Sequence, residues 1–180
     1  MTDLHAALVE DLDTGFACLV RTHERLLLGT ALRLTSHRAA AEDLAAEAFL
    51  RAFRALRDYD AARIEALDLR AWLVTVLLNE HRNQIRTATR RPATAGAPVP
   101  DRAARDPGPE ELAARADPAL ADALAALPAV QRDAVVLRHV ADLDVPAVAA
   151  ALGVAEGTAR SHVSRGLARL RTLLADRTPS

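Results

Sequence analysis

The chain has no lysine, one cysteine, few aromatic residues and almost no net charge. Its 180 residues carry 23 basic side chains, all arginine, against 24 acidic ones, so the formal net charge is −1. This balance excludes a protein that coats nucleic acid by bulk charge, and any DNA binding must come from local patches or with help from a partner. Because aromatic residues make up only 3%, the cores must be built from Leu, Val and Ala. The abundance of Ala, Leu and Arg favours helix throughout.

Several kinds of functional site are also missing. Cys18 stands alone, which excludes a disulfide framework and a cysteine-based metal site. The six histidines show no metal-ligand spacing, and the chain has neither a glycine-rich phosphate loop nor a nucleophile elbow. We therefore expect no catalysis, no metal and no cofactor. Because we find neither a long apolar run nor a charged-then-apolar leader, we expect a soluble, cytoplasmic protein.

Residues 143–174 have the pattern of a helix-turn-helix. Pro146 suits the opening turn of the first helix, and Gly153 supplies the left-handed residue that ends it. The second helix has an apolar stripe on one side and a polar face on the other, which consist of Val163, Leu167, Leu170 and Leu174, and of Arg160, Ser161, Ser164 and Arg165. No acidic residue interrupts it between Glu156 and Asp176. This local cationic element suits phosphates and base edges in a DNA major groove.

Residues 1–91 predict an N-terminal domain with three strong helices. The first opens at Asp13 or Thr14, and the second starts at Ser36. Residues 59–68 form a polar break without a helix cap of its own, which predicts a loop with a short helical piece. The third helix covers residues 69–90, and its expected apolar set is Trp72, Leu73, Val76, Leu77 and Ile85.

A proline-rich stretch separates this domain from the C-terminal one. Residues 92–118 hold six of the nine prolines and little that is bulky and apolar, which is typical of a flexible linker. Beyond it, residues 119–127 and 128–140 predict two amphipathic helices that complete a four-helix domain at 119–180. The expected fold is therefore all-α, with two small helical domains joined by a flexible Pro/Ala-rich linker.

Three segments carry a specific resemblance to a known family. AEDLAAEAFLRAFRAL (residues 41–56), RAWLVTVLLNEHRNQIR (residues 70–86) and residues 127–174 resemble the conserved regions of extracytoplasmic-function sigma factors, in the right order and spacing. The resemblance implies a promoter-specificity subunit that recognises −10 and −35 elements, helps to melt the −10 region and performs no chemistry. The implied partners are promoter DNA and core RNA polymerase, through its β′ and β subunits. Family members are commonly held by an anti-sigma factor.

The resemblance also implies roles for residues of the N-terminal domain. Asp43 and Glu47 would dock on the coiled coil of β′, and as an i, i+4 acidic pair they gain most when a cationic partner arrives. Ala46 stands where the family usually has Gln. The −10 set would hold an unstacked base and the phosphates of its strand, and it consists of Trp72, Asn79, Arg82, Asn83 and Arg86. We interpret Trp72 first as a core residue and only second as a stacking platform for a base.

In the C-terminal domain the resemblance implies that the second helix of the motif reads the −35 element. The groove-facing residues would be Arg160, Ser161, Ser164 and Arg165, with Thr158 and Arg132 on phosphates. Two alternatives stay open: a regulator that binds DNA through residues 143–174 without polymerase, and a protein-interaction bundle. The first leaves the two N-terminal segments unexplained, and the second leaves both arginine surfaces unexplained. A requirement for core polymerase at a cognate promoter separates them.

Overall fold

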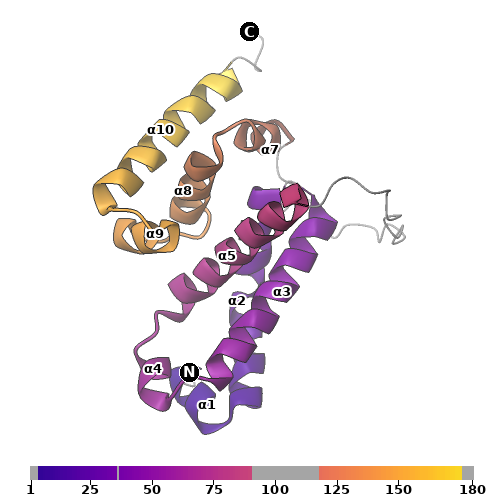
Figure 1. The fold of residues 1–180 in the computed structure, drawn as a ribbon, viewed down its shortest axis with the longest axis vertical. Helices are drawn as coiled ribbons and strands as arrows, with labels where there is room; N and C mark the ends of the chain where they lie inside the picture. The colour runs from indigo at the N-terminus through magenta and orange to yellow at the C-terminus, as the bar shows by residue number, and fades with distance from the viewer. Residues whose placement is uncertain (1–3, 36, 91–117, 176–180) are drawn as a thin grey trace.

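The computed structural model describes residues 4–35, 37–90 and 118–175, and all of its regular elements there are helices. The helices are α1 (Leu4–Glu10), α2 (Leu12–Thr35), α3 (Arg38–Arg57), α4 (Ala61–Glu65), α5 (Leu69–Arg90), α7 (Pro118–Ala125), α8 (Ala129–His139), α9 (Val145–Leu152) and α10 (Glu156–Ala175). Figure 1 shows α1 to α5 in the lower part of the molecule and α7 to α10 in the upper part. The all-α prediction is confirmed. The predicted linker lies outside the described residues except for Pro118, which begins α7.

In the N-terminal group, α2 packs against α3, and both helices pack against α5. Their core is aliphatic, as expected from the composition, and its fully buried side chains include Leu19, Leu27, Leu44, Leu56, Leu73 and Leu77. Phe16 of α2 makes edge-to-face contacts with Phe49 and Phe53 of α3, at ring-centroid distances of 6.3 and 5.0 Å. Such contacts add specific geometry to a core with few aromatic residues.

Three local predictions for this part need correction. Helix α1 was not expected, and α2 begins at Leu12, where the Asp11 carboxylate accepts a hydrogen bond from the Asp13 N–H at 3.2 Å. The polar break does contain a cap, because the Asp60 side chain accepts from the Arg63 N–H at 2.8 Å and starts α4. Asp68 caps α5 in the same way, through the Ala71 N–H. The expected start at Ser36 lies outside the described residues.

The helix-turn-helix of α9 and α10 has the predicted geometry. Asp144 caps α9 by accepting from the Ala147 N–H at 2.8 Å, and Pro146 lies in the first turn. Gly153 follows α9 with φ 69°, a left-handed conformation in which L residues are strained. These local signals fix the angle at which α10 leaves the turn.

The buried side of α10 differs from the predicted stripe. Its buried residues are Ala159, Gly166 and Leu170, whereas Val163 and Leu167 are only half-buried. A Cβ at Gly166 would lie 2.6 Å from Val135 Cγ2 and 3.0 Å from the Gln131 carbonyl oxygen. The missing side chain therefore lets α10 approach α8 closely, and α10 turns a different face inward from the one that hydropathy alone favours.

The two groups of helices also pack against each other. Helix α2 contacts α7 and α8, and α5 contacts α9. As a result α5 is covered on more than one side: Val74, Leu78 and His81 are buried, while Ile85, which we expected in the core, is 43% exposed. Among the described residues, no helix combines the length and apolar composition that crossing a bilayer requires.

The tight α8–α10 contact predicts the effect of a single methyl group. Gly166→Ala should destabilise the protein by about 1–3 kcal/mol, because the added Cβ overpacks against Val135 and the α8 backbone. Gly157→Ala, on the same helix with open space around it, should be neutral or stabilise by up to about 1 kcal/mol. Chemical denaturation measures both. Equal stability of the two variants would contradict the close approach.

Candidate nucleic-acid interface

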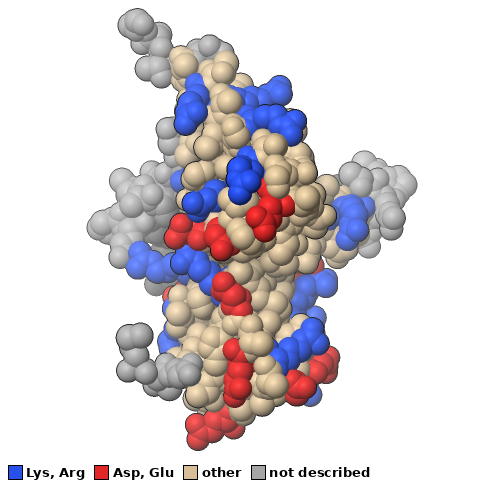
Figure 2. Space-filling model, turned by 90° about the vertical axis from the view of Figure 1, so that its left-hand side faces the viewer, with Lys and Arg blue, Asp and Glu red and all other residues tan. Residues whose placement is uncertain are grey.

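The exposed side of α10 presents most of the residues predicted to meet the −35 element. These residues are Thr158, Arg160, Ser161, Ser164 and Arg165. The Ser161 hydroxyl donates to the Gly157 carbonyl oxygen at 2.9 Å, and Arg165 Nε donates to the Ser161 carbonyl oxygen at 3.2 Å. Arginine side chains gather over the upper part of the face shown in Figure 2, whereas most acidic side chains lie lower on it. The protein thus has a local cationic surface despite its near-neutral total charge.

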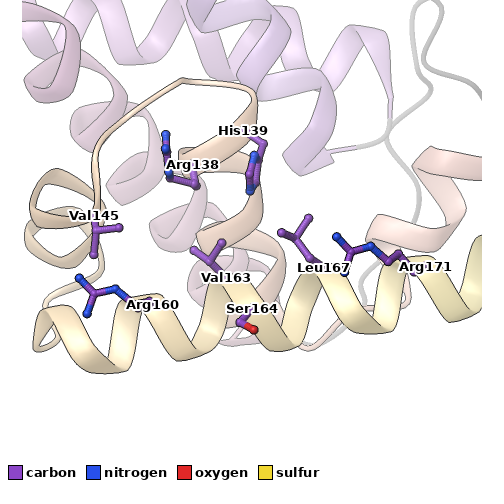
Figure 3. A pocket seen from close by; sticks show the side chains of 8 residues that line it. All are labelled: Arg138, His139, Val145, Arg160, Val163, Ser164, Leu167 and Arg171. Atoms are coloured by element: carbon purple, nitrogen blue, oxygen red, sulfur yellow. The ribbon is translucent and has the colours of Figure 1, made fainter.

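This set divides into two groups around the helix. At 100° per residue, Thr158, Ser161 and Arg165 fall within roughly 60° of one another. Arg160 and Ser164 lie further round, where they line a groove of about 370 Å³ between α10, the end of α8 and the start of α9 (Figure 3). The groove has an apolar floor and basic edges, and its other lining residues are Arg138, His139, Val145, Val163, Leu167 and Arg171. The half-buried Val163 and Leu167 are therefore groove residues.

Arg132 does not lie with the rest of the −35 set. It belongs to α8, is half-buried, and its Nε is a buried atom without a hydrogen-bond partner. Its positive charge acts on the pKa values of both His81 and Asp133. The structure thus places Arg132 beside α5 of the N-terminal group.

The −10 set follows one side of α5. Asn79, Asn83 and Arg86 are spaced i, i+4, i+7 and are exposed or half-buried. Trp72, two turns before Asn79, is half-buried and packs against the core, as expected for a core residue. Its ring lies 6.1 Å from that of Tyr59, which in turn carries the Arg63 guanidinium 3.7 Å from its centroid.

Arg82, the remaining member of the −10 set, is half-buried and pairs with a buried side chain of α8. Its Nε and Nη2 both donate to Asp133 Oδ2 of α8, at 3.3 and 3.2 Å. The Asp133 side chain is 5% exposed, and its other oxygen has no partner. Burial raises the pKa of the Asp133 carboxyl, an effect that Arg82, Arg132 and His81 partly oppose. Sequence analysis missed Asp133, although it lies four residues before Leu137 on the buried side of α8.

The predicted polymerase-docking residues lie on α3. Asp43 is exposed, and Glu47 is 34% exposed with its Oε1 3.3 Å from Arg51 Nε and 3.8 Å from Arg54 Nη1. Arg51 also forms an ion pair with the buried Glu80 of α5, a link that sequence analysis did not suggest. Leu50, one turn after Glu47, is 50% exposed. An acidic pair and an exposed leucine thus share this surface.

A basic, polar face on the second helix of a helix-turn-helix, in a chain whose described elements are all helices, defines a DNA-binding protein of the helix-turn-helix class. The family is shown by comparison with known proteins. The model of Sigma-70 region 2 matches residues 19–91, and that of Sigma-70, region 4 matches residues 118–170. The chain belongs to the extracytoplasmic-function sigma factors of RNA polymerase, and it is a transcription initiation factor.

Several relatives and solved structures are similar to it. The ECF RNA polymerase sigma factor SigE of Mycolicibacterium smegmatis is 36% identical over 160 residues, which cover 87% of this chain and 60% of the relative. RNA polymerase sigma-E factor of Streptomyces avermitilis is 35% identical over 158 residues, covering 88% and 84%. Among structures, CnrH in complex with the cytosolic domain of CnrY has a TM-score of 0.70 at 25% identity and covers 97% of both chains. RpoE of Bartonella quintana, in complex with the anti-sigma factor NepR, has a TM-score of 0.66 at 26% identity, covering 93% of this chain and 98% of that one.

The buried histidine at the junction of the two helix groups predicts a pH effect on stability. Burial lowers the pKa of His81, so its imidazole stays neutral in the fold while the unfolded chain takes up a proton below about pH 6.5. The contribution of His81 is therefore lost as the pH falls below that value. His81→Gln should lose less stability than the parent between about pH 7.5 and about pH 5.5 in denaturant titrations.

The control for this experiment is His139→Gln, at an exposed position in the last turn of α8. It should keep the pH dependence of the parent. Burial also lowers the pKa of His23, so part of the pH dependence should survive in His81→Gln. The raised pKa of Asp133 acts with the opposite sign, since a carboxyl that binds its proton more tightly in the fold adds stability as the pH falls. An identical pH profile for parent and His81→Gln would refute the assignment.

Proposed function

We propose that this sigma factor directs core RNA polymerase to promoters by reading the −35 element with α10 and holding the −10 strand with α5. The observation that carries the proposal is the exposed polar and basic face of α10 within a helix-turn-helix. In this assignment residues 1–91 serve polymerase and the −10 element, residues 119–180 serve the −35 element, and residues 92–118 join them. The protein performs no chemistry of its own and acts in the cytoplasm.

The −35 contact rests on Ser161 and Arg165, with Thr158 on the same side of α10. An arginine in the major groove reads guanine through two parallel hydrogen bonds, and a serine accepts or donates to either base of a pair. Arg160 and Ser164 line the protein groove between α8, α9 and α10, and from there they would approach the DNA backbone. Arg132 reaches a phosphate only if it leaves its half-buried place beside α5.

The −10 contact rests on the line of Asn79, Asn83 and Arg86. Promoter melting needs a surface that holds an unstacked base by its edge while cations hold the strand. The two asparagine amides offer donors and acceptors for the base edge. Arg86 and, when released from Asp133, Arg82 offer the cations.

Polymerase docking rests on the surface of Asp43, Glu47 and Leu50. An exposed leucine beside acids suits a partner helix with basic and apolar residues. Arg51 and Arg54 already approach Glu47 Oε1 in the free chain, so a cationic partner competes with them for this carboxylate. An anti-sigma factor is a further expected partner, in line with the complexes of CnrH with CnrY and RpoE with NepR.

If α10 reads bases, one substitution on it should lower both promoter affinity and base preference. Arg165→Ala should weaken promoter binding by holoenzyme by about 1–3 kcal/mol and relax preference at one −35 position, because a bidentate contact to a base edge disappears. Arg169→Ala, one turn further along α10, should cost less and change no base preference. Competition binding with promoters substituted at each −35 position measures both effects. Equal and sequence-independent losses would mean that α10 only holds phosphates.

Polymerase dependence predicts a second loss. Residues 1–91 hold 13 arginines and 13 acidic residues, and residues 119–180 hold 7 and 6, so neither part has the excess charge that tight solitary binding requires. Reversing Asp43 and Glu47 to Arg should abolish specific initiation by reconstituted holoenzyme and leave the weak direct DNA binding unchanged. In vitro transcription and a filter-binding assay separate these quantities.

The matched control reverses Glu24 and Glu65 to Arg, which are exposed on α2 and α4 and give the same change in total charge. This variant should still initiate. Initiation by the Asp43 and Glu47 variant would refute the docking surface. Tight binding of the free protein to a defined site at physiological salt, unchanged by either double reversal, would instead support a regulator that works without polymerase.

A further inference from the structure

Asp133 is a buried charge that neither DNA reading nor polymerase docking uses. It stands at the start of a run of buried residues in α8, Ala134 to Leu137, and is itself only 4% exposed. Burying a carboxylate is unfavourable unless a cation and hydrogen bonds compensate. Its cation is Arg82, which lies 51 residues earlier in the chain and on the other group of helices. The pair is therefore a contact between the two groups.

The Arg82–Asp133 ion pair fixes the relative position of the two groups of helices, but it adds little to their affinity for each other. Arg82 reaches one carboxylate oxygen through two nitrogens and leaves the other without a partner. A buried ion pair of this kind often fails to repay its desolvation, but it fixes one register, because either charge alone in that place is strongly unfavourable. A second contact, from Arg70 Nε to the Ala141 carbonyl oxygen at 3.0 Å, ties the start of α5 to the loop between α8 and α9. Docking is specific yet poised to open.

The docked arrangement conflicts with promoter binding. Arg82, assigned to the −10 strand, is ion-paired with Asp133, and Arg132, assigned to a −35 phosphate, is the neighbour of Asp133 in α8, so both arginines lie at the junction of the two groups. On a promoter the two elements are about 25 base pairs apart, roughly 85 Å along B-DNA. The two arginines cannot serve both elements while they lie at one junction. While Asp133 occupies Nε and Nη2 of Arg82, only the Nη1 edge of the guanidinium is left for a phosphate, and the carboxylate offsets much of its positive charge.

We propose that the docking of α7 to α10 onto α2 and α5 is an autoinhibited state of the free sigma factor, latched by the Arg82–Asp133 ion pair, which must break before α5 can hold promoter DNA. This inference rests on the proposed DNA role of α5. Opening exposes both arginines at once, Arg82 for the −10 element and Arg132 for the −35 element. If docking occupies about 90% of the free molecules, it raises the apparent Kd for DNA about tenfold.

A charge swap tests the latch without DNA. Donor and acceptor dyes on Glu65→Cys and Ala168→Cys, exposed positions of α4 and α10, report the distance between the groups in a Cys18→Ser background. Asp133→Arg places a positive charge beside Arg82 and Arg132, and Arg82→Asp places a second negative charge beside Asp133. Because each variant creates repulsion at the junction, each should lower the energy transfer. The double swap should restore it. The control, Glu156→Arg, makes the same change in charge as Asp133→Arg on the exposed first turn of α10 and should leave the transfer unchanged.

Promoter binding then tests autoinhibition. In the full chain without polymerase, Asp133→Arg should bind promoter DNA about tenfold more tightly than the parent, and more tightly than Glu156→Arg, whose added positive charge lies on the proposed −35 helix. Circular dichroism must show parental helix content. Unchanged energy transfer in a folded Asp133→Arg, or no recovery in the double swap, would overturn the latch. If Asp133→Arg lowers the energy transfer and the double swap restores it, but Asp133→Arg binds DNA no more tightly than Glu156→Arg, autoinhibition is overturned.

The same material separates this inference from the proposed function. Arg86→Ala added to Asp133→Arg should weaken DNA binding if α5 holds the −10 strand. If it does not, the DNA role of α5 fails, while the energy-transfer result, measured without DNA, still decides whether the latch exists.

Discussion

Helix α5 is the element on which the rest of the structure depends, because three different surfaces must share its 22 residues. One side packs Leu73 and Leu77 into the N-terminal core. Another meets α9 and, through Arg82, α8. The remaining side carries the asparagines of the proposed −10 contact. Because one helix carries all three surfaces, a change at one of them affects the others. The docking of the two groups is therefore linked to the availability of the DNA-binding side chains.

Local signals explain why much of the fold could be predicted. Pro146 and Gly153 mark the two ends of α9 through backbone conformations that do not depend on the rest of the chain. The 3.6-residue spacing of Leu44, Ala48, Ala52 and Leu56 likewise gives the buried side of α3. These parts of the sequence specify structure within one or two turns, so no knowledge of the partner helices is needed.

What sequence analysis missed depends on tertiary contact. Ile85 continues an apolar stripe, yet 43% of it is exposed. Gly166 looks like a flaw in a helix until α8 is placed against it. Asp133 looks like a surface acid in a short amphipathic helix, and only the position of Arg82 explains its burial. The cap at Asp60 is different, because an Asp three residues before Arg63 is a local signal for a helix start even within a polar stretch.

Two of the proposed interfaces, the polymerase surface on α3 and the −10 surface on α5, share one physical feature: charges of the free chain already pair with their side chains. Arg51 and Arg54 hold Glu47, and Asp133 holds Arg82. Arg51 joins the two, since it also pairs with the buried Glu80, next to Asn79 on α5. A partner therefore exchanges one ion pair for another, and the net gain is smaller than the new contact alone. We therefore expect polymerase and DNA to strengthen each other's binding, because each supplies replacement charges for the ion pairs that the other breaks.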